Sequence, residues 1–144
     1  MPTRRQFLAA AAASAASLAA AAALDACGAP LAPSSDIVGP PTVRIPLPSV
    51  GQTVGVDGVG EGGQGIAVTR VSDASVAAVS RLCTHQACTI ELPAPSPGGY
   101  MICPCHGSLF TVQGAVVRGP AGSPLRTFAA GIDLPNNQVV ITNS

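Results

Sequence analysis

The stretch that decides the fold is "CPCHGS", Cys103–Ser108, taken together with "CTHQAC", Cys83–Cys88, which precedes it in the chain. The chain has 5 cysteines and 2 histidines, and all of them except Cys27 fall inside these two stretches. Random placement would almost never produce this clustering. The two stretches are therefore expected to form one site.

The spacing within the stretches indicates a metal centre, because it reads C-x-H and then C-x-x-H. These positions supply two sulfur and two nitrogen donors: Cys83, His85, Cys103 and His106. Zinc binds such a set tetrahedrally, but a structural zinc site has no need of two further cysteines. A redox-active dithiol made of Cys103 and Cys105 gives the histidines no role. The remaining candidate is a 2Fe-2S cluster with both cysteines on one iron and both histidines on the other.

The two stretches resemble the two boxes of Rieske iron-sulfur proteins, C-T-H-x-x-C and C-P-C-H-G-S, in the same order and at matching spacing. The resemblance extends over residues 76–125. It implies one 2Fe-2S cluster with sulfur ligands on the inner iron and imidazole ligands on the outer iron: Cys83 and Cys103 for the first, His85 and His106 for the second. It also implies that the remaining pair, Cys88 and Cys105, forms a disulfide that holds the two loops together.

Residues around the boxes are expected to tune this centre. Ser108, which follows Gly107 in the second box, matches the family serine whose hydroxyl donates to a bridging sulfide. Phe110 falls where high-potential members carry a tyrosine that donates to a cysteine sulfur. Because phenylalanine has no hydroxyl, the resemblance implies a lower potential. Gly119 and Pro120 open "GPAGSPL", which resembles the proline loop that covers the cluster in respiratory members; an ordinary surface turn is the alternative.

The composition favours short strands joined by turns. The chain has 16 glycines and 14 prolines, and only 3% of its residues are aromatic. Short runs with strand character are separated by turn signals, which predicts an all-β fold, an antiparallel β-sandwich or barrel. The Rieske resemblance adds a small cluster-binding subdomain made of two loops. The runs cover residues 42–48, 51–56, 65–71, 75–83, 89–92, 99–103, 109–112, 114–119, 125–135 and 138–142.

The first 27 residues resemble a targeting segment. Arg4 and Arg5 precede an apolar run over residues 7–24, and "TRRQFL" resembles the twin-arginine export signal. That route, as the resemblance implies, exports proteins already folded, which suits a chain that receives a cofactor in the cytoplasm. An amphipathic helix and an uncleaved membrane anchor are the alternatives, although the run is shorter than the ~20 residues that span a bilayer.

The targeting segment ends in "LDAC", which resembles a lipoprotein processing site and implies lipidation of Cys27. Asp25 departs from the small apolar residue usual at that position, and an inert cysteine is the alternative. Residues 28–41 are rich in Pro, Gly and Ser and are expected to form an extended linker. The Rieske domain is then expected to occupy residues 42–144.

The resemblance implies an electron-transfer role. In the family's cytochrome bc complexes the cluster accepts electrons from quinol, so the chain is expected to be the iron-sulfur component of a quinol-oxidising system, with cytochrome b or c type partners. The alternatives are an electron-transfer subunit of another periplasmic oxidoreductase, resembling arsenite oxidase, and a free-standing periplasmic carrier. Gln86 stands where respiratory members usually carry an apolar residue.

Charge and residue content limit the other functions. The 7 arginines are balanced by 7 acidic residues, so nothing attracts a nucleic acid. No catalytic base, nucleophile or substrate pocket is visible in the sequence, and the chain is therefore expected to be a redox subunit rather than an enzyme by itself. A lasting disulfide requires an oxidising compartment. The expected location is the periplasmic side of the cytoplasmic membrane, with attachment through the N-terminus.

Overall fold

The computed structural model describes residues 36–92 and 99–144. The chain divides into two units, residues 1–31 and residues 32–144, and all described residues belong to the second. The expected export signal, Cys27 and the start of the expected linker lie outside the described residues. Within the described ranges, no helix has the length and apolar character needed to cross a membrane.

The described residues form an antiparallel all-β fold, which confirms the predicted fold class. Its strands are β1 (Ile37–Val38), β2 (Thr42–Pro46), β3 (Thr53–Val56), β4 (Gly60–Glu61), β5 (Ile66–Ser72), β6 (Ser75–Ser80), β7 (Met101–Ile102), β8 (Leu109–Phe110), β9 (Val116–Arg118), β10 (Thr127–Asp133) and β11 (Gln138–Thr142). The largest sheet has the order β2-β11-β10-β6-β5-β3, and two smaller sheets have the orders β7-β8-β9 and β1-β4.

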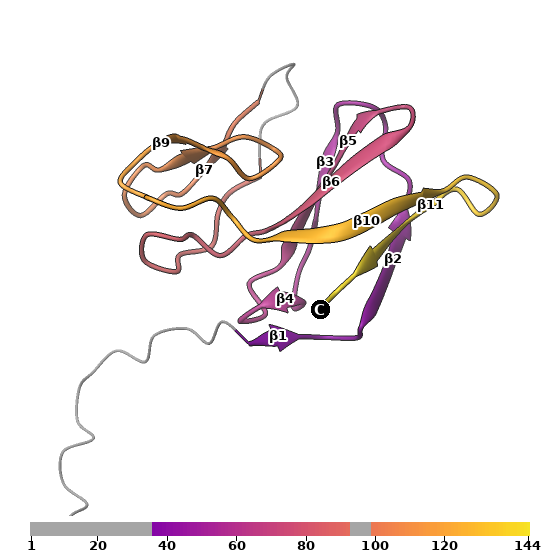
Figure 1. Ribbon diagram of the computed structural model, residues 1–144, viewed down its shortest axis with the longest axis horizontal. Helices are drawn as coiled ribbons and strands as arrows, with labels where there is room; N and C mark the ends of the chain where they lie inside the picture. The colour runs from indigo at the N-terminus through magenta and orange to yellow at the C-terminus, as the bar shows by residue number, and fades with distance from the viewer. Residues whose placement is uncertain (1–35, 93–98) are drawn as a thin grey trace, which may run out of the picture. The chain divides into compact units, whose positions relative to one another are not determined.

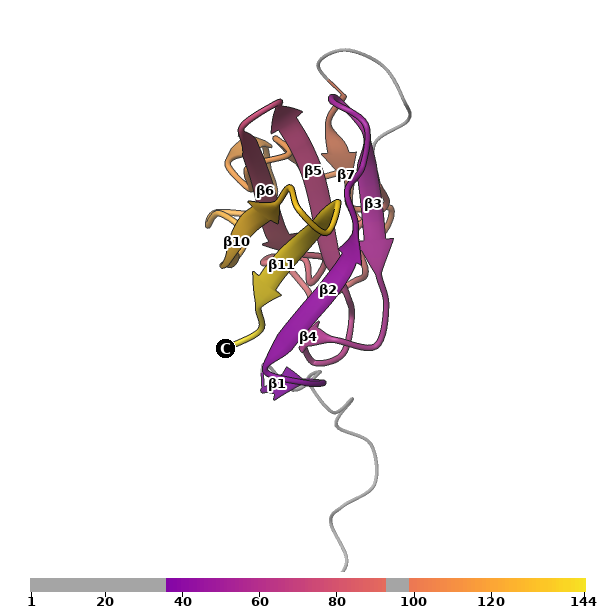
Figure 2. The same ribbon diagram turned by 90° about the vertical axis from the view of Figure 1, so that its right-hand side faces the viewer.

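The largest sheet curls, and the three-stranded sheet lies to one side of it. In Figure 1, β7 and β9 stand apart from β2 and β11, and the long strands β6 and β10 lead from one region to the other. Figure 2 shows β2 and β11 crossing in front of β5 and β6, as expected of a sheet that turns back on itself. Right-handed strand twist accumulates across six strands and produces this curvature.

Two apolar cores lie on opposite faces of the hairpin β5–β6. Alternate residues of a strand point to opposite faces, so Ile66 and Val68 enter one core while Ala67, between them, enters the other. On β6, Ala78 and Val79 divide in the same way. Burial on both faces explains why residues 66–68 and 76–79 are continuous apolar segments and do not alternate with polar residues.

The two short strands β1 and β4 occur where no strand was predicted. Ile37 and Val38, which lie inside the expected linker, pair with Glu61 and Gly60. The buried side chain of Asn143 holds this corner, because its amide nitrogen donates to the backbone oxygens of Val38 and Pro40 at 2.9 Å each. In contrast, the run at residues 89–92 forms no named strand and makes isolated bridges, Leu82↔Thr89 and Glu91↔Ile102.

Candidate metal centre

The two motif stretches form two loops with the same backbone hydrogen bonds. In the first, the N–H of Cys83 donates to the oxygen of Cys88 at 2.9 Å, and the N–H of Ala87 donates to the oxygen of Cys83 at 2.8 Å. In the second, the N–H of Cys103 donates to the oxygen of Ser108 at 2.9 Å, and that of Gly107 donates to the oxygen of Cys103 at 2.9 Å. Each loop is thus a six-residue turn that begins on a cysteine.

The fifth residue of each loop has a left-handed backbone, with φ of 52° at Ala87 and 75° at Gly107. A side chain with a Cβ is strained in this region, whereas glycine is not. Replacing Ala87 with glycine should therefore raise the free energy of unfolding by about 0.5 kcal/mol, and Gly107→Ala should lower it by about 1 kcal/mol.

These two substitutions are matched controls for each other, and urea unfolding measures both. A Cβ added to Gly107 would meet its nearest neighbour at 3.9 Å, so the expected loss reflects backbone strain and not a clash. Changes of the same sign for both variants would contradict the strain argument.

A disulfide joins the two loops. Cys88, the last residue of the first loop, is bonded to Cys105 in the second, and their Cα atoms are 6.5 Å apart. The pairing implied by the Rieske resemblance is confirmed. The disulfide fixes the first loop against the second and leaves Cys83 and Cys103 as the free cysteines of the described residues.

The two free thiols lie side by side in the apolar interior. Cys83 is 2% exposed and Cys103 is 1% exposed, and both belong to the core cluster that contains Met101 and Phe110. Burial raises the pKa of the Cys103 thiol, and its hydrogen bond with Cys83 adds to the rise, while the backbone N–H groups of Cys105 and His106 oppose it. A buried thiolate pair thus calls for a compensating positive charge, which a metal supplies.

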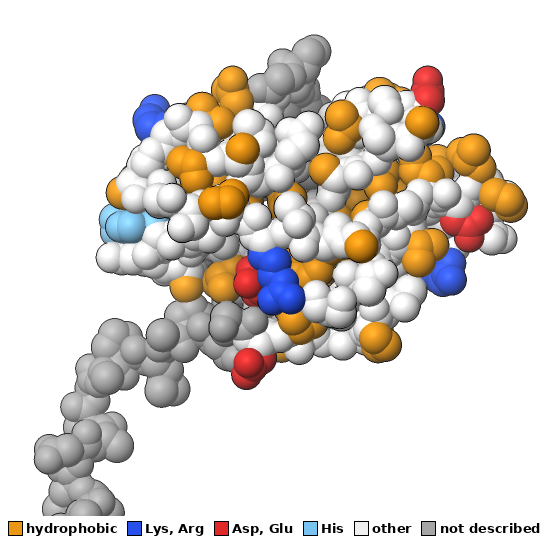
Figure 3. All heavy atoms as spheres, viewed as in Figure 1, with side chains coloured by type: hydrophobic (Ala, Val, Ile, Leu, Met, Phe, Trp, Pro, Cys, Tyr) orange, Lys and Arg blue, Asp and Glu red, His pale blue; other side chains and the backbone are white. Residues whose placement is uncertain are grey.

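The two imidazole rings meet at the outer side of the loops. The ring centroids of His85 and His106 are 4.8 Å apart, with the planes at 82°. The Nδ1 atom of His85 is buried and has no hydrogen-bond partner. A buried nitrogen without a partner is costly, and a metal bond through Nδ1 removes that cost. His106 is exposed, so the nitrogen side of the candidate centre faces solvent. Figure 3 shows histidine side chains, in pale blue, at the surface of the molecule.

The predicted ligands therefore come together as a sulfur pair inside and an imidazole pair outside. The Sγ atom of Cys103 also lies within 4.8 Å of the sulfurs of Cys88 and Cys105. These two sulfurs are already bonded to each other and have no thiolate to offer a metal. Mixed thiolate and imidazole donors in equal number suit a histidine-ligated 2Fe-2S cluster.

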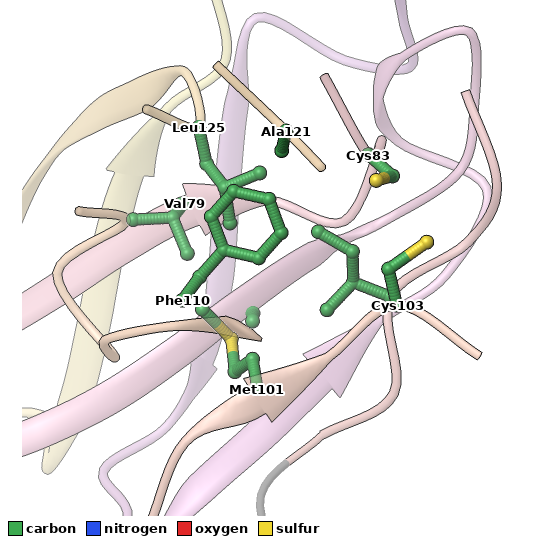
Figure 4. Packing of buried hydrophobic residues seen from close by; sticks show 9 residues of the cluster. Val79, Cys83, Met101, Cys103, Phe110, Ala121 and Leu125 are labelled. Carbon is green, nitrogen blue, oxygen red and sulfur yellow. The ribbon is translucent and has the colours of Figure 1, made fainter. Parts of the chain in front are cut away.

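The predicted tuning residues lie directly behind the sulfur pair. Ser108 is fully buried, and its Oγ accepts a hydrogen bond from the N–H of Ala121 at 3.0 Å, which leaves the hydroxyl hydrogen free to donate. Phe110 is also fully buried. Figure 4 shows its ring beside Leu125, with Cys83 and Cys103 at the edge of the same cluster.

The "GPAGSPL" segment contacts both loops. Its Ala121 binds the hydroxyl of Ser108, as described above. Its Ser123 accepts a 2.6 Å hydrogen bond from the hydroxyl of Thr84 in the first loop. The segment, which starts with a cis Gly119–Pro120 bond, therefore closes a third side of the candidate centre. Thr84 has no predicted role, although its place between the two predicted ligands Cys83 and His85 is a signal in the sequence.

The fold and this donor set describe a β-sheet protein whose two loops could hold a metal centre on sulfur and nitrogen donors. Residues 48–129 match the family model of the Rieske 2Fe-2S domain, and the chain belongs to this family. Membership assigns it a 2Fe-2S cluster.

The curated relatives point to one kind of complex. The chain is 36% identical over 74 residues to the cytochrome b6-f complex iron-sulfur subunit of Prochlorococcus marinus strain MIT 9301. The aligned part is 51% of this chain and 39% of that subunit. The chain is 41% identical over 64 residues to the same subunit of strain MIT 9211, covering 44% and 34%. The chain thus spans less than half the length of the curated relatives it matches.

Two solved structures resemble this chain over part of its length. The plasma membrane Rieske protein PetC3 of Synechocystis PCC 6803 is 29% identical with a TM-score of 0.48, over 54% of this chain and 75% of that one. The terminal oxygenase of carbazole 1,9a-dioxygenase from Novosphingobium sp. KA1 is 15% identical with a TM-score of 0.50, over 75% and 31%. At 15% identity, the second likeness concerns the fold alone.

Proposed function

We propose that this chain is a one-electron carrier whose cluster is bound by Cys83 and Cys103 on one iron and by His85 and His106 on the other. The observation that carries the proposal is the pairing of two buried thiols with a buried, unpartnered Nδ1 of His85. A bound 2Fe-2S cluster supplies reversible one-electron transfer. The chain's own residues determine where the electron enters and how strongly it is held.

The burial pattern gives the electron one route. The apolar cluster around Met101 and Phe110 encloses the sulfur side, while His106 is exposed. Electrons therefore pass through the imidazole side, where a partner can approach. Neutral imidazoles in place of two thiolates leave the oxidised cluster without net charge, so adding an electron is easier than in an all-cysteine cluster.

The iron-sulfur component of a quinol-oxidising, cytochrome bc-like system is the role supported best. The named relatives are iron-sulfur subunits of a cytochrome complex, and a solvent-facing imidazole can accept a hydrogen bond from quinol. The partners would be cytochrome b or c type proteins. The disulfide supports an oxidising compartment, in agreement with twin-arginine export to the periplasmic side of the membrane and attachment there through the N-terminus, with or without lipidation of Cys27.

Gln86 favours a second candidate. This residue is exposed in the first loop. Respiratory members of the family usually carry an apolar residue at this position. A polar residue here suits docking on a more hydrated partner surface. This would fit an electron-transfer subunit of another periplasmic oxidoreductase, or a free carrier. A cytochrome b gene next to this one would favour the first role, and a gene for a large catalytic subunit would favour the second.

Metal analysis and electron spin resonance test the cluster itself. Protein produced in a cell that assembles iron-sulfur clusters should contain two irons and two acid-labile sulfides per chain. After reduction its spectrum should have a mean g-value below that of a free electron, as mixed histidine and cysteine ligation requires. A zinc-loaded protein would give no signal, and iron-free protein would refute the proposal.

Replacing Phe110 with tyrosine should raise the midpoint potential. The ring is fully buried in the cluster of residues that includes both free cysteines. High-potential Rieske proteins carry a tyrosine here that donates to a cysteine sulfur, and the new hydroxyl is expected to do the same. A hydrogen bond of about 1 kcal/mol to the reduced state corresponds to about 40 mV for one electron. Redox titration measures the change, and Phe110→Leu is the control, since it adds no donor. Equal potentials for the tyrosine and leucine variants would contradict the prediction.

A further inference from the structure

Arg118 lies directly over the second cluster-binding loop. It is the last residue of β9, opposite Leu109, and is exposed to solvent. Its guanidinium donates to the backbone oxygen of Gly107 at 3.1 Å. A Cβ placed on Gly107 would lie 3.9 Å from the same guanidinium nitrogen. The positive charge is therefore held against the residue between the predicted ligand His106 and the buried Ser108.

No acidic residue neutralises this charge within the described part of the chain. The other described arginines each form an ion pair with a carboxylate: Arg44 with Asp133, Arg70 with Asp73, Arg81 with Asp57 and Arg126 with Glu61. Arg118 forms none there. On its own sheet the nearest acid in register is Glu91, which is reached across Ile102 and Leu109. Three strand spacings of about 4.8 Å put roughly 14 Å between their backbones.

We propose that Arg118 raises the reduction potential of the cluster through its charge. This inference rests on the proposed cluster between the two loops. Reduction adds one negative charge to the centre. A fixed cation bound to Gly107, the residue next to His106, therefore stabilises the reduced state more than the oxidised state. The hydrogen bond to Gly107 keeps the cation in place. Its exposure to solvent means that dissolved salt screens the effect.

Redox titration of three variants tests the inference. Arg118→Gln removes the charge and keeps a polar side chain; Arg118→Lys keeps the charge. Arg44→Gln is the matched control, because it removes a half-exposed arginine from β2, far from β9 in Figure 1. Each protein is titrated at about 0.01 M and about 1 M ionic strength, where the Debye lengths are about 30 Å and 3 Å. Thermal unfolding of each variant checks that the fold is intact.

The expected result is a lower midpoint potential for Arg118→Gln at low salt, with most of the difference lost at high salt. Arg118→Lys should stay close to the wild type, and Arg44→Gln should be unchanged. A potential for Arg118→Gln equal to that of the wild type at low salt would overturn the inference. Equal, salt-independent decreases in Arg118→Gln and Arg118→Lys would also overturn it, because they would show an effect of loop geometry and not of charge.

The two proposals fail in different ways. If the wild type contains no iron-sulfur cluster, the proposed function fails. If the wild type and Arg118→Gln both contain the cluster and share one potential, the function stands and only the role of Arg118 is lost. If only Arg118→Gln loses the cluster, Arg118→Lys decides the question. A midpoint potential of Arg118→Lys that matches the wild type at low salt supports the role of charge. A lower midpoint potential of Arg118→Lys overturns it.

Discussion

Replacing Cys103 with serine should leave the protein without iron. Cys103 is 1% exposed, and its sulfur lies beside Cys83 and accepts hydrogen bonds from the backbone N–H groups of Cys105 and His106. A serine hydroxyl fits the space but stays protonated at neutral pH and is a poor ligand for the soft iron-sulfur core. Iron and acid-labile sulfide should fall from two of each per chain to near zero. Elemental analysis and the visible absorption of the purified protein measure the loss.

Two further variants distinguish loss of the cluster from loss of the fold. Cys103→Ser changes the core and can therefore disturb folding, whereas His106 is exposed and His106→Gln should leave the fold intact while still losing the cluster. Cys27→Ser removes the cysteine that lies outside the two motifs and should keep the full iron content. Retention of iron and sulfide in both Cys103→Ser and His106→Gln would refute the proposed ligand set.

Removing the disulfide should cause the largest loss of thermal stability. Cys88 and Cys105 are 17 residues apart, and on the chain-entropy model a link that closes a loop of this length contributes about 3 kcal/mol. The double substitution Cys88→Ala with Cys105→Ala should therefore lower the unfolding temperature by roughly 12–20 °C in a domain of about 100 residues. Thermal unfolding followed by circular dichroism measures the shift.

The reductant supplies the control. Wild-type protein treated with a reductant should unfold near the temperature of the double variant, and the double variant itself should not respond to the reductant. A double variant that unfolds at the wild-type temperature would show that the small three-stranded sheet and the proline loop already fix both loops without the covalent link.

Strands with a strong local pattern could be predicted from the sequence. The runs that became β5 and β6 contain the apolar segments 66–68 and 76–79 and are bounded by turn residues, so the strand assignment follows from the local pattern. β1 and β4 could not be predicted, since each has two residues and no periodicity. What holds that corner is Asn143, which contacts Val38 from 105 residues further along the chain.

For the candidate site, the loops and the disulfide could be predicted, but the backbone conformation and the strand register could not. The motif spacing identified the loops, and the family resemblance identified the disulfide, which the structure confirms. Neither indicated that Ala87 has a left-handed backbone, because alanine carries no signal for it. The contact between Arg118 and Gly107 depends on the pairing of β8 with β9, where the register shifts between Leu109 and Phe110. No pattern in the sequence predicts that shift.

The two loops share one backbone arrangement but carry their histidines at different positions. The same pair of backbone hydrogen bonds closes both turns, yet one presents a histidine at its third position, His85, and the other at its fourth, His106. The main-chain hydrogen bonds therefore do not determine which type of donor atom each loop presents to the candidate centre. Exchanging imidazole for thiolate in these loops would change side chains and leave the backbone as it is. Designed variants of this backbone should therefore cover a wider range of reduction potentials than the single value of this protein.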